Sequence, residues 1–99
     1  MGRIDPKDQN IAIEGTALGY EHNEVRKILD MLRKSRAARG GVGAPLKAPA
    51  HLRDAAAGIG VVITDADLNP NKPEGKVERY DRLSDTARRI NEAEKEQQG

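Results

Sequence analysis

The sequence predicts a small, mainly α-helical and extended protein that has little core of its own. Leu, Ile and Val together supply only 19 of the 99 residues, whereas Ala alone supplies 13, and Phe, Trp and Cys are absent. Helical spacing of aliphatic residues is clear in one segment, and no long alternating run predicts a sheet. So few large aliphatic side chains place the chain at the limit of burying enough apolar surface to fold alone.

The first expected helix covers residues 6–18. Asp5 can accept a hydrogen bond from an exposed backbone amide, and Pro6 suits the first helical position. Gly15 lowers the helix propensity of the segment. Gly19 suits the left-handed conformation that commonly ends a helix.

The second expected helix, residues 21–39, has the strongest pattern. Its aliphatic residues recur at intervals of three and four and form one apolar stripe, which consists of Val25, Ile28, Leu29 and Leu32. Beyond the stripe the sequence favours helix without an apolar face until two glycines follow. We expect the stripe to dock on a partner protein.

Residues 40–49 (GGVGAPLKAP) predict a flexible linker between an N-terminal helical segment, 1–39, and a C-terminal segment, 50–99. The C-terminal segment begins with a short helix over 50–57. A strand is expected near 60–64, and a second near 76–80 would complete a hairpin, although two strands alone are marginally stable in water.

The last expected helix is mostly polar and covers residues 84–97, with Ser84 as its cap. A helix with so few apolar residues needs a partner surface. Along the whole sequence, the large aliphatic residues are concentrated in two segments, 25–32 and 59–63. We expect Val61 and Ile63 in the second cluster to contact a partner protein, as the stripe in the first does.

The charges nearly cancel overall but are arranged in blocks. Residues 1–25 carry two basic and five acidic side chains, residues 26–53 carry eight and one, and residues 54–99 carry seven and ten. Six of the central basic residues form a candidate polyanion-binding set, which consists of Arg26, Lys27, Arg33, Lys34, Arg36 and Arg39. Such a helix can lie along a phosphate backbone and release counterions, although no aromatic residues are interleaved with it. An acidic protein surface, a copy of the chain or solvent are the alternatives.

No motif predicts catalysis, a cofactor or a metal site. Residues 65–71 place oxygen ligands at alternate positions as a calcium loop does, but Pro70 replaces the glycine and Lys76 the final glutamate of that motif. Neither glycine-rich stretch completes a nucleotide-binding motif. His22 and His51 lack a nucleophile motif, so we expect exposed helix histidines and no enzyme activity.

A short resemblance covers about 20 of the 99 residues. Leu18-Gly19-Tyr20, followed by Glu24-Val25 and Ile28-Leu29, resembles the turn and helix of ubiquitin-associated-like domains. Such domains place a third helix soon after the second, whereas the glycine-rich residues 40–46 follow here. The resemblance implies no function for this chain.

These observations favour a non-enzymatic structural or adaptor protein that neighbouring subunits order within a larger assembly, such as a phage-like particle. Its partners would be protein subunits, copies of the chain among them, and the strand near 60–64 would augment another subunit's sheet. The alternative is a small nucleic-acid-binding or regulatory protein that uses residues 26–39, and an inhibitor of a nucleoprotein complex would use the same residues. Neither function involves a membrane or cofactor. The lack of a signal sequence or an apolar span favours the cytoplasm or a particle.

Overall fold

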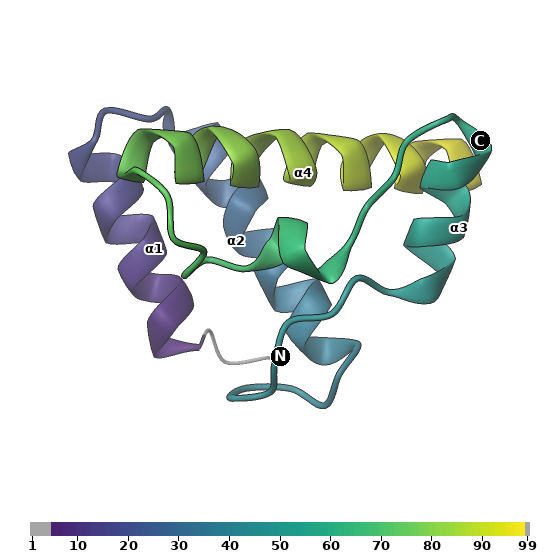
Figure 1. The fold of residues 1–99 in the computed structure, drawn as a ribbon, viewed down its shortest axis with the longest axis horizontal. Helices are drawn as coiled ribbons and strands as arrows, with labels where there is room; N and C mark the ends of the chain where they lie inside the picture. The colour runs from purple at the N-terminus through teal and green to yellow at the C-terminus, as the bar shows by residue number, and fades with distance from the viewer. Residues whose placement is uncertain (1–4, 99) are drawn as a thin grey trace.

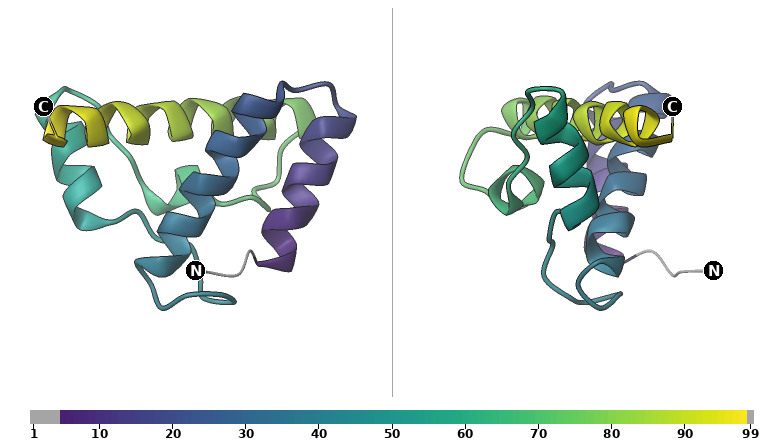
Figure 2. Two further views of the ribbon diagram at one scale, coloured as in Figure 1. Left: turned by 180° about the vertical axis from the view of Figure 1, so that it is seen from behind. Right: turned by 90° about the vertical axis from the view of Figure 1, so that its right-hand side faces the viewer.

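The computed structural model describes residues 5–98, which form four α-helices and one 3-10 helix (Figure 1). In chain order these are α1 (Pro6–Ala17), α2 (His22–Ala37), α3 (Ala50–Gly58), η1 (Asp65–Leu68) and α4 (Lys76–Gln98). The longest helix, α4, runs across one side of the molecule, and the other three helices extend away from it, as Figure 2 shows from two further sides. The helices expected over residues 6–18, 21–39 and 50–57 are confirmed.

Both ends of α1 are set by the residues that the sequence indicates. At the start, the Asp5 carboxylate accepts a hydrogen bond of 2.9 Å from the backbone amide of Lys7. At the other end, Gly19 has a φ of 92°, and its amide bonds to the carbonyl of Thr16. The next amide bonds to the carbonyl of Gly15, which completes the double hydrogen bond of a Schellman motif.

The apolar stripe of α2 lies in the centre of the core. Ile28 and Leu32 are completely buried and Val25 is nearly so. The buried cluster around Ile28 and Leu32 draws on every helix and on the loops, and its other members are Ile11, Met31, Ala48, Leu52, Ala56, Ile63, Leu68, Tyr80, Leu83, Ala87, Ile90 and Ala93. The expectation of little independent core was therefore wrong. The count of Leu, Ile and Val underestimated the core because alanine, methionine and tyrosine also contribute buried side chains to it.

The chain is also not extended, contrary to the expectation from its sequence. The described residues have a radius of gyration of 12.8 Å and extents of 35 × 25 × 25 Å. A folded domain of about 100 residues has a radius of about 13 Å. The shape follows from the packing, because α4 contacts both α2 and α3, while α1 packs against α2. Among residues 5–98, no helix combines the length and apolar character that crossing a membrane requires.

The hairpin expected from residues 60–64 and 76–80 was wrong. Residues 61–64 are extended, but they pair with no strand in the described part of the chain, and residues 76–80 form the first turns of α4. Ser84 lies inside that helix instead of capping it. The buried apolar residues of α4 follow a helical spacing that includes a tyrosine and two alanines, namely Tyr80, Leu83, Ala87, Ile90 and Ala93.

The segment expected to be a linker, residues 40–49, is held against the fold. The amide of Gly43 donates to the Asp5 carboxylate at 2.8 Å, and the amide of Ala48 donates to Asp65 at 2.9 Å. Ala48 is completely buried. These contacts connect the segment both to the start of α1 and to η1.

Candidate functional site

The apolar residues expected to dock on a partner do not form one exposed surface. Val25, Ile28, Leu32 and Ile63 are each at most 6% exposed and pack inside the protein. Leu29 and Val61 are half-buried at separate places, the first on α2 and the second in the loop after α3. In this fold, intramolecular contacts therefore occupy most of the apolar stripe.

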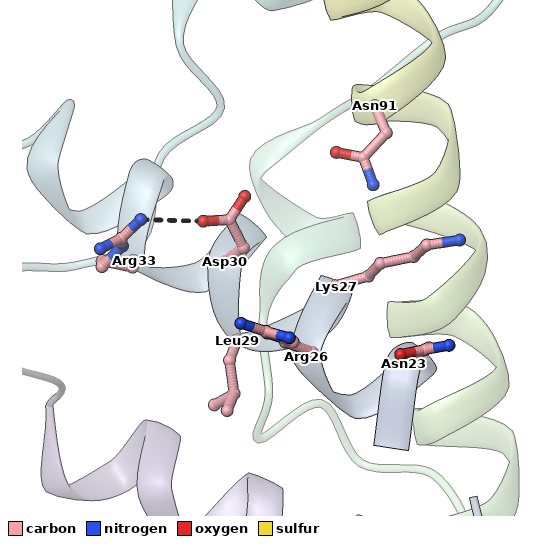
Figure 3. A pocket seen from close by; sticks show the side chains of 7 residues that line it. All are labelled: Asn23, Arg26, Lys27, Leu29, Asp30, Arg33 and Asn91. Carbon is pink, nitrogen blue, oxygen red and sulfur yellow. Dashed lines mark hydrogen bonds and ion pairs between the residues drawn. The ribbon is translucent and has the colours of Figure 1, made fainter. Parts of the chain in front are cut away.

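The side of α2 that faces away from the core forms a shallow hollow lined mostly by polar and charged residues (Figure 3). Its volume is about 740 Å³, and it is lined by Asn23, Arg26, Lys27, Leu29, Asp30 and Arg33 of α2 and by Asn91 of α4. In Figure 3, Lys27 extends toward α4, with Asn23 and Asn91 on either side of it. We call the polar α2 residues of this hollow the outer face: Asn23, Arg26, Lys27, Asp30 and Arg33.

Two cations of the outer face have no internal partner. Arg26 and Lys27 are exposed, and neither forms an ion pair within the described residues. An exposed arginine or lysine can exchange its counterions for the phosphates of a ligand.

The remaining cations near this face are paired with carboxylates. Arg33 is 2.9 Å from Asp30, and its side chain is 54% exposed. Lys34 lies at the edge of the face, where its Nζ is 3.1 Å from Asp30 and 2.9 Å from Glu94 of α4. Partial burial opposes the shift, but hydrogen bonds from Lys34 and Arg33 lower the pKa of Asp30. Partial burial of Lys34 acts to lower its pKa, but the hydrogen bonds to Glu94 and Asp30 outweigh this effect and raise the pKa of Lys34.

Arg36 and Arg39 lie away from the outer face. Arg36 is buried, and its guanidinium makes two hydrogen bonds to the Asp8 carboxylate, at 3.0 and 3.2 Å. It also bonds to the carbonyl of Ala44 and lies 3.7 Å from Asp5. Arg39 is exposed beyond the end of α2. Of the six basic residues in the candidate polyanion set, Arg26, Lys27 and Arg33 thus share the exposed face.

The amides of the hollow were not expected from the sequence. Asn23 could have been included by its helical spacing from Lys27, because residues four positions apart share a face. Asn91 had no such signal, since it reaches the hollow only where α4 passes α2. The same crossing brings Glu94 to Lys34, and it depends on long-range packing.

The α4 side of the hollow has mixed charge. Lys27 and Asn91 also line a neighbouring hollow together with Arg88, Glu92, Glu94 and Lys95. Arg88 forms ion pairs with two residues of its own helix, at 2.6 Å from Asp85 and 3.2 Å from Glu92. The hydrogen bond to Asp85 is the main cause of the raised pKa of Arg88. The carboxylates of α4 therefore limit the cationic surface on this side.

A second exposed feature is the extended segment of residues 61–64. Val62 is 73% exposed whereas Ile63 is 5% exposed, the alternation of a strand with one buried face. Within the described residues, the backbone groups of Val62 and Ile63 make no hydrogen bonds to the protein. The segment ends where the amide of Thr64 donates to Asp67, at the start of η1.

The histidines and acidic residues of the described part of the chain form no candidate metal site. His22 and His51 are exposed on different helices, and residues 5–98 contain no group of three or more side chains placed to hold a metal ion. Comparison with protein-family models, curated proteins and solved structures finds no match for this chain.

Proposed function

We propose that the protein is a small, non-enzymatic binding protein that contacts the phosphate backbone of nucleic acid through the outer face of α2. The observation that supports this function is the exposure of Arg26, Lys27 and Arg33 on one side of the helix. Among the described residues, Asp30 is the one acidic residue that lines the hollow, and its charge is already paired with that of Arg33.

Binding of this kind gains free energy when phosphates replace the cations' counterions. Arg26 and Lys27 lose no internal ion pair on binding, and the exposed Arg33–Asp30 pair stabilises the protein by only about 0–1 kcal/mol. Arg33 can therefore exchange Asp30 for a phosphate at little cost. With three phosphate contacts, the logarithm of the binding constant should fall with the logarithm of salt concentration at a slope of about −3.

The test replaces the three cations together, as Arg26→Ala, Lys27→Ala and Arg33→Ala. Fluorescence anisotropy with labelled nucleic acid at several salt concentrations should show that binding is lost or that its salt slope approaches zero. A matched control removes three exposed cations elsewhere, as Lys7→Ala, Lys72→Ala and Lys76→Ala. The control makes the same change in net charge and should retain most of the binding. Equal loss in both variants, or no binding by the native chain, would refute the proposal.

A second candidate function is that of a subunit in an assembly of copies of this chain, and the exposed segment of residues 61–64 supports it. Unpaired backbone groups beside an exposed valine suit pairing with another extended strand. Two copies could pair antiparallel about Val62, and residues 61–64 carry no charge that would oppose this.

Sedimentation velocity over a range of protein concentrations tests this second function. Concentration-dependent association that Val62→Lys abolishes would support an assembly subunit. A monomer at every concentration would exclude self-assembly through this segment. Circular dichroism of the same samples shows whether the monomer melts cooperatively without a partner.

A further inference from the structure

Neither aromatic side chain of the protein lines the hollow on the outer face of α2. The chain has two tyrosines and no Phe or Trp. Tyr80 is completely buried, and its hydroxyl donates to the carbonyl of Ile11 at 2.5 Å. The Tyr20 ring lies 5.3 Å from that of Tyr80, and its hydroxyl bonds to Asp81 at 2.9 Å and to the carbonyl of Val77. Both rings therefore belong to the contact between α4 and the end of α1.

This arrangement matters because proteins that bind single strands combine cationic grooves with aromatic platforms. Stacking on such a platform contributes about 1–3 kcal/mol for each base. The outer face of α2 offers cations and amides but no ring. A single strand bound there would leave its bases without a protein partner.

A duplex requires no such platform, since its bases are already stacked on each other. It also presents a dense, regular array of charge, about one phosphate for each 1.7 Å of helix axis. Arg26 and Arg33 are seven residues apart on one rigid helix, which separates them by about 10 Å along its axis. Each phosphate contact gains more from counterion release on duplex DNA than on a single strand, with salt slopes of about −0.9 and −0.7 per contact.

Two amides add hydrogen-bonding capacity at the edge of this face. Asn23 and Asn91 lie on either side of Lys27 (Figure 3) and can donate to phosphate or sugar oxygens. Beyond Asn91, the carboxylates of Glu92 and Glu94 balance the charges of Arg88 and Lys95, so this side offers a phosphate backbone little net attraction. The favourable surface is therefore a strip along α2 that ends at α4.

We infer that the outer face of α2, together with Asn91 of α4, binds duplex DNA through its phosphates in preference to single strands and without reading sequence. This inference rests on the proposed function and identifies the class of nucleic acid that the site takes.

The first experiment compares a DNA duplex of mixed sequence with an oligothymidine strand of equal length, by fluorescence anisotropy at matched salt. The duplex should bind about five-fold or more tightly and show the steeper salt dependence. Duplexes rich in A·T and in G·C should bind within about two-fold of each other. Equal or tighter binding of oligothymidine would overturn the inference but leave the proposed function intact. Failure to bind the duplex and the oligothymidine strand alike would refute the inference and the proposed function together. Preferential binding of polyglutamate would also refute both and would identify an acidic protein as the partner.

The second experiment places a negative charge in the hollow by Asn91→Asp. The duplex should then bind several-fold more weakly, because the new carboxylate lies beside Lys27. Asn71→Asp, at an exposed loop position, makes the same charge change as a matched control. Equal weakening in the two variants would remove Asn91 from the site. Thermal melting of both, followed by circular dichroism, verifies that the fold is retained.

Discussion

Arg36 connects the end of α2 to the start of α1 through a buried ion pair. Replacing it as Arg36→Met keeps much of the side chain's volume but leaves the Asp8 carboxylate, 2% exposed, without its partner. Removing one member of a buried pair costs about 3–5 kcal/mol, so the free energy of unfolding should fall by roughly that amount in urea titrations.

The matched control for this prediction is Arg33→Met. Arg33 also contacts an aspartate, but its side chain is 54% exposed, and the change should cost less than about 1 kcal/mol. Similar losses in the two variants would contradict the structural role given to Arg36. The sequence could not distinguish these two arginines, because both occur in the same basic run and only long-range packing buries one of them.

Gly15 allows the close approach of α1 to α4. A Cβ atom at this position would lie 2.8 Å from the Tyr80 ring and 3.3 Å from the side chain of Val25. Gly15→Ala should therefore destabilise the protein by about 1–3 kcal/mol through overpacking, although alanine favours the helix itself by about 1 kcal/mol. The sequence marked Gly15 as a weak point of the helix but did not indicate this packing role.

A glycine at the end of α3 provides the control for that substitution. Gly58 has no atom within 4 Å of its ideal Cβ position and no positive φ. Gly58→Ala should leave the melting temperature unchanged or raise it, since the variant gains helix propensity without a clash. A lower melting temperature for Gly58→Ala than for Gly15→Ala would contradict the packing argument.

At the scale of elements, local signals predicted the first three helices well, but they did not predict the start of α4 or the unpaired segment before η1. Asp5, Pro6 and Gly19 act within a turn of the helix ends they define, so α1 was predictable from short-range chemistry. The regular aliphatic spacing of α2 likewise indicated its buried side, but the exposed hollow on its other side needs Asn91 from α4. The start of α4 was missed because Val77 and Tyr80 suit a strand as well as a helix.

Hydrogen exchange of individual amides distinguishes the observed elements from the expected hairpin. The amides of Val62 and Ile63 should exchange rapidly, because the described fold gives them no acceptor. Those of Leu83 and Ala87, buried in α4, should be among the slowest to exchange. Protection of Val62 and Ile63 in dilute monomer would contradict this structure. Protection that develops only with rising concentration would support pairing of copies through this segment.

At the scale of the whole molecule, the core depends on small residues as much as on large aliphatic ones. Ala48, Ala56 and Ala93 are completely buried, which allows helices and loops to approach closely. A low count of Leu, Ile and Val suggested an extended chain, but that count does not measure how tightly alanine-rich surfaces pack. Compactness was therefore not predictable from composition, although the helical class was.

Two carboxylates whose pKa values are lowered by hydrogen bonds, Asp5 and Glu74, make the stability of the whole fold depend on pH. Amide hydrogen bonds from Lys7 and Gly43 lower the pKa of Asp5 below 3.8, and the hydrogen bond from Arg82 lowers the pKa of Glu74 below 4.5. Each group binds its proton more weakly when folded than when unfolded. Its contribution to stability is therefore complete above the unfolded pKa and is lost as the pH falls through the lowered folded pKa.

The midpoint of urea unfolding should thus be nearly constant from neutral pH down to about pH 5 and should decrease as the pH falls below about 4. Asp5→Asn cannot titrate and keeps only one acceptor oxygen, so it can accept from the amide of Lys7 or of Gly43 but not from both, because the two amides bond to different carboxylate oxygens. This variant should be less stable than the native chain at neutral pH and should lose less stability on acidification, so the two curves converge at low pH. Parallel curves would show that Asp5 has the same pKa in the folded and unfolded states, and would contradict its role in holding the 40–49 segment against α1 by its charge.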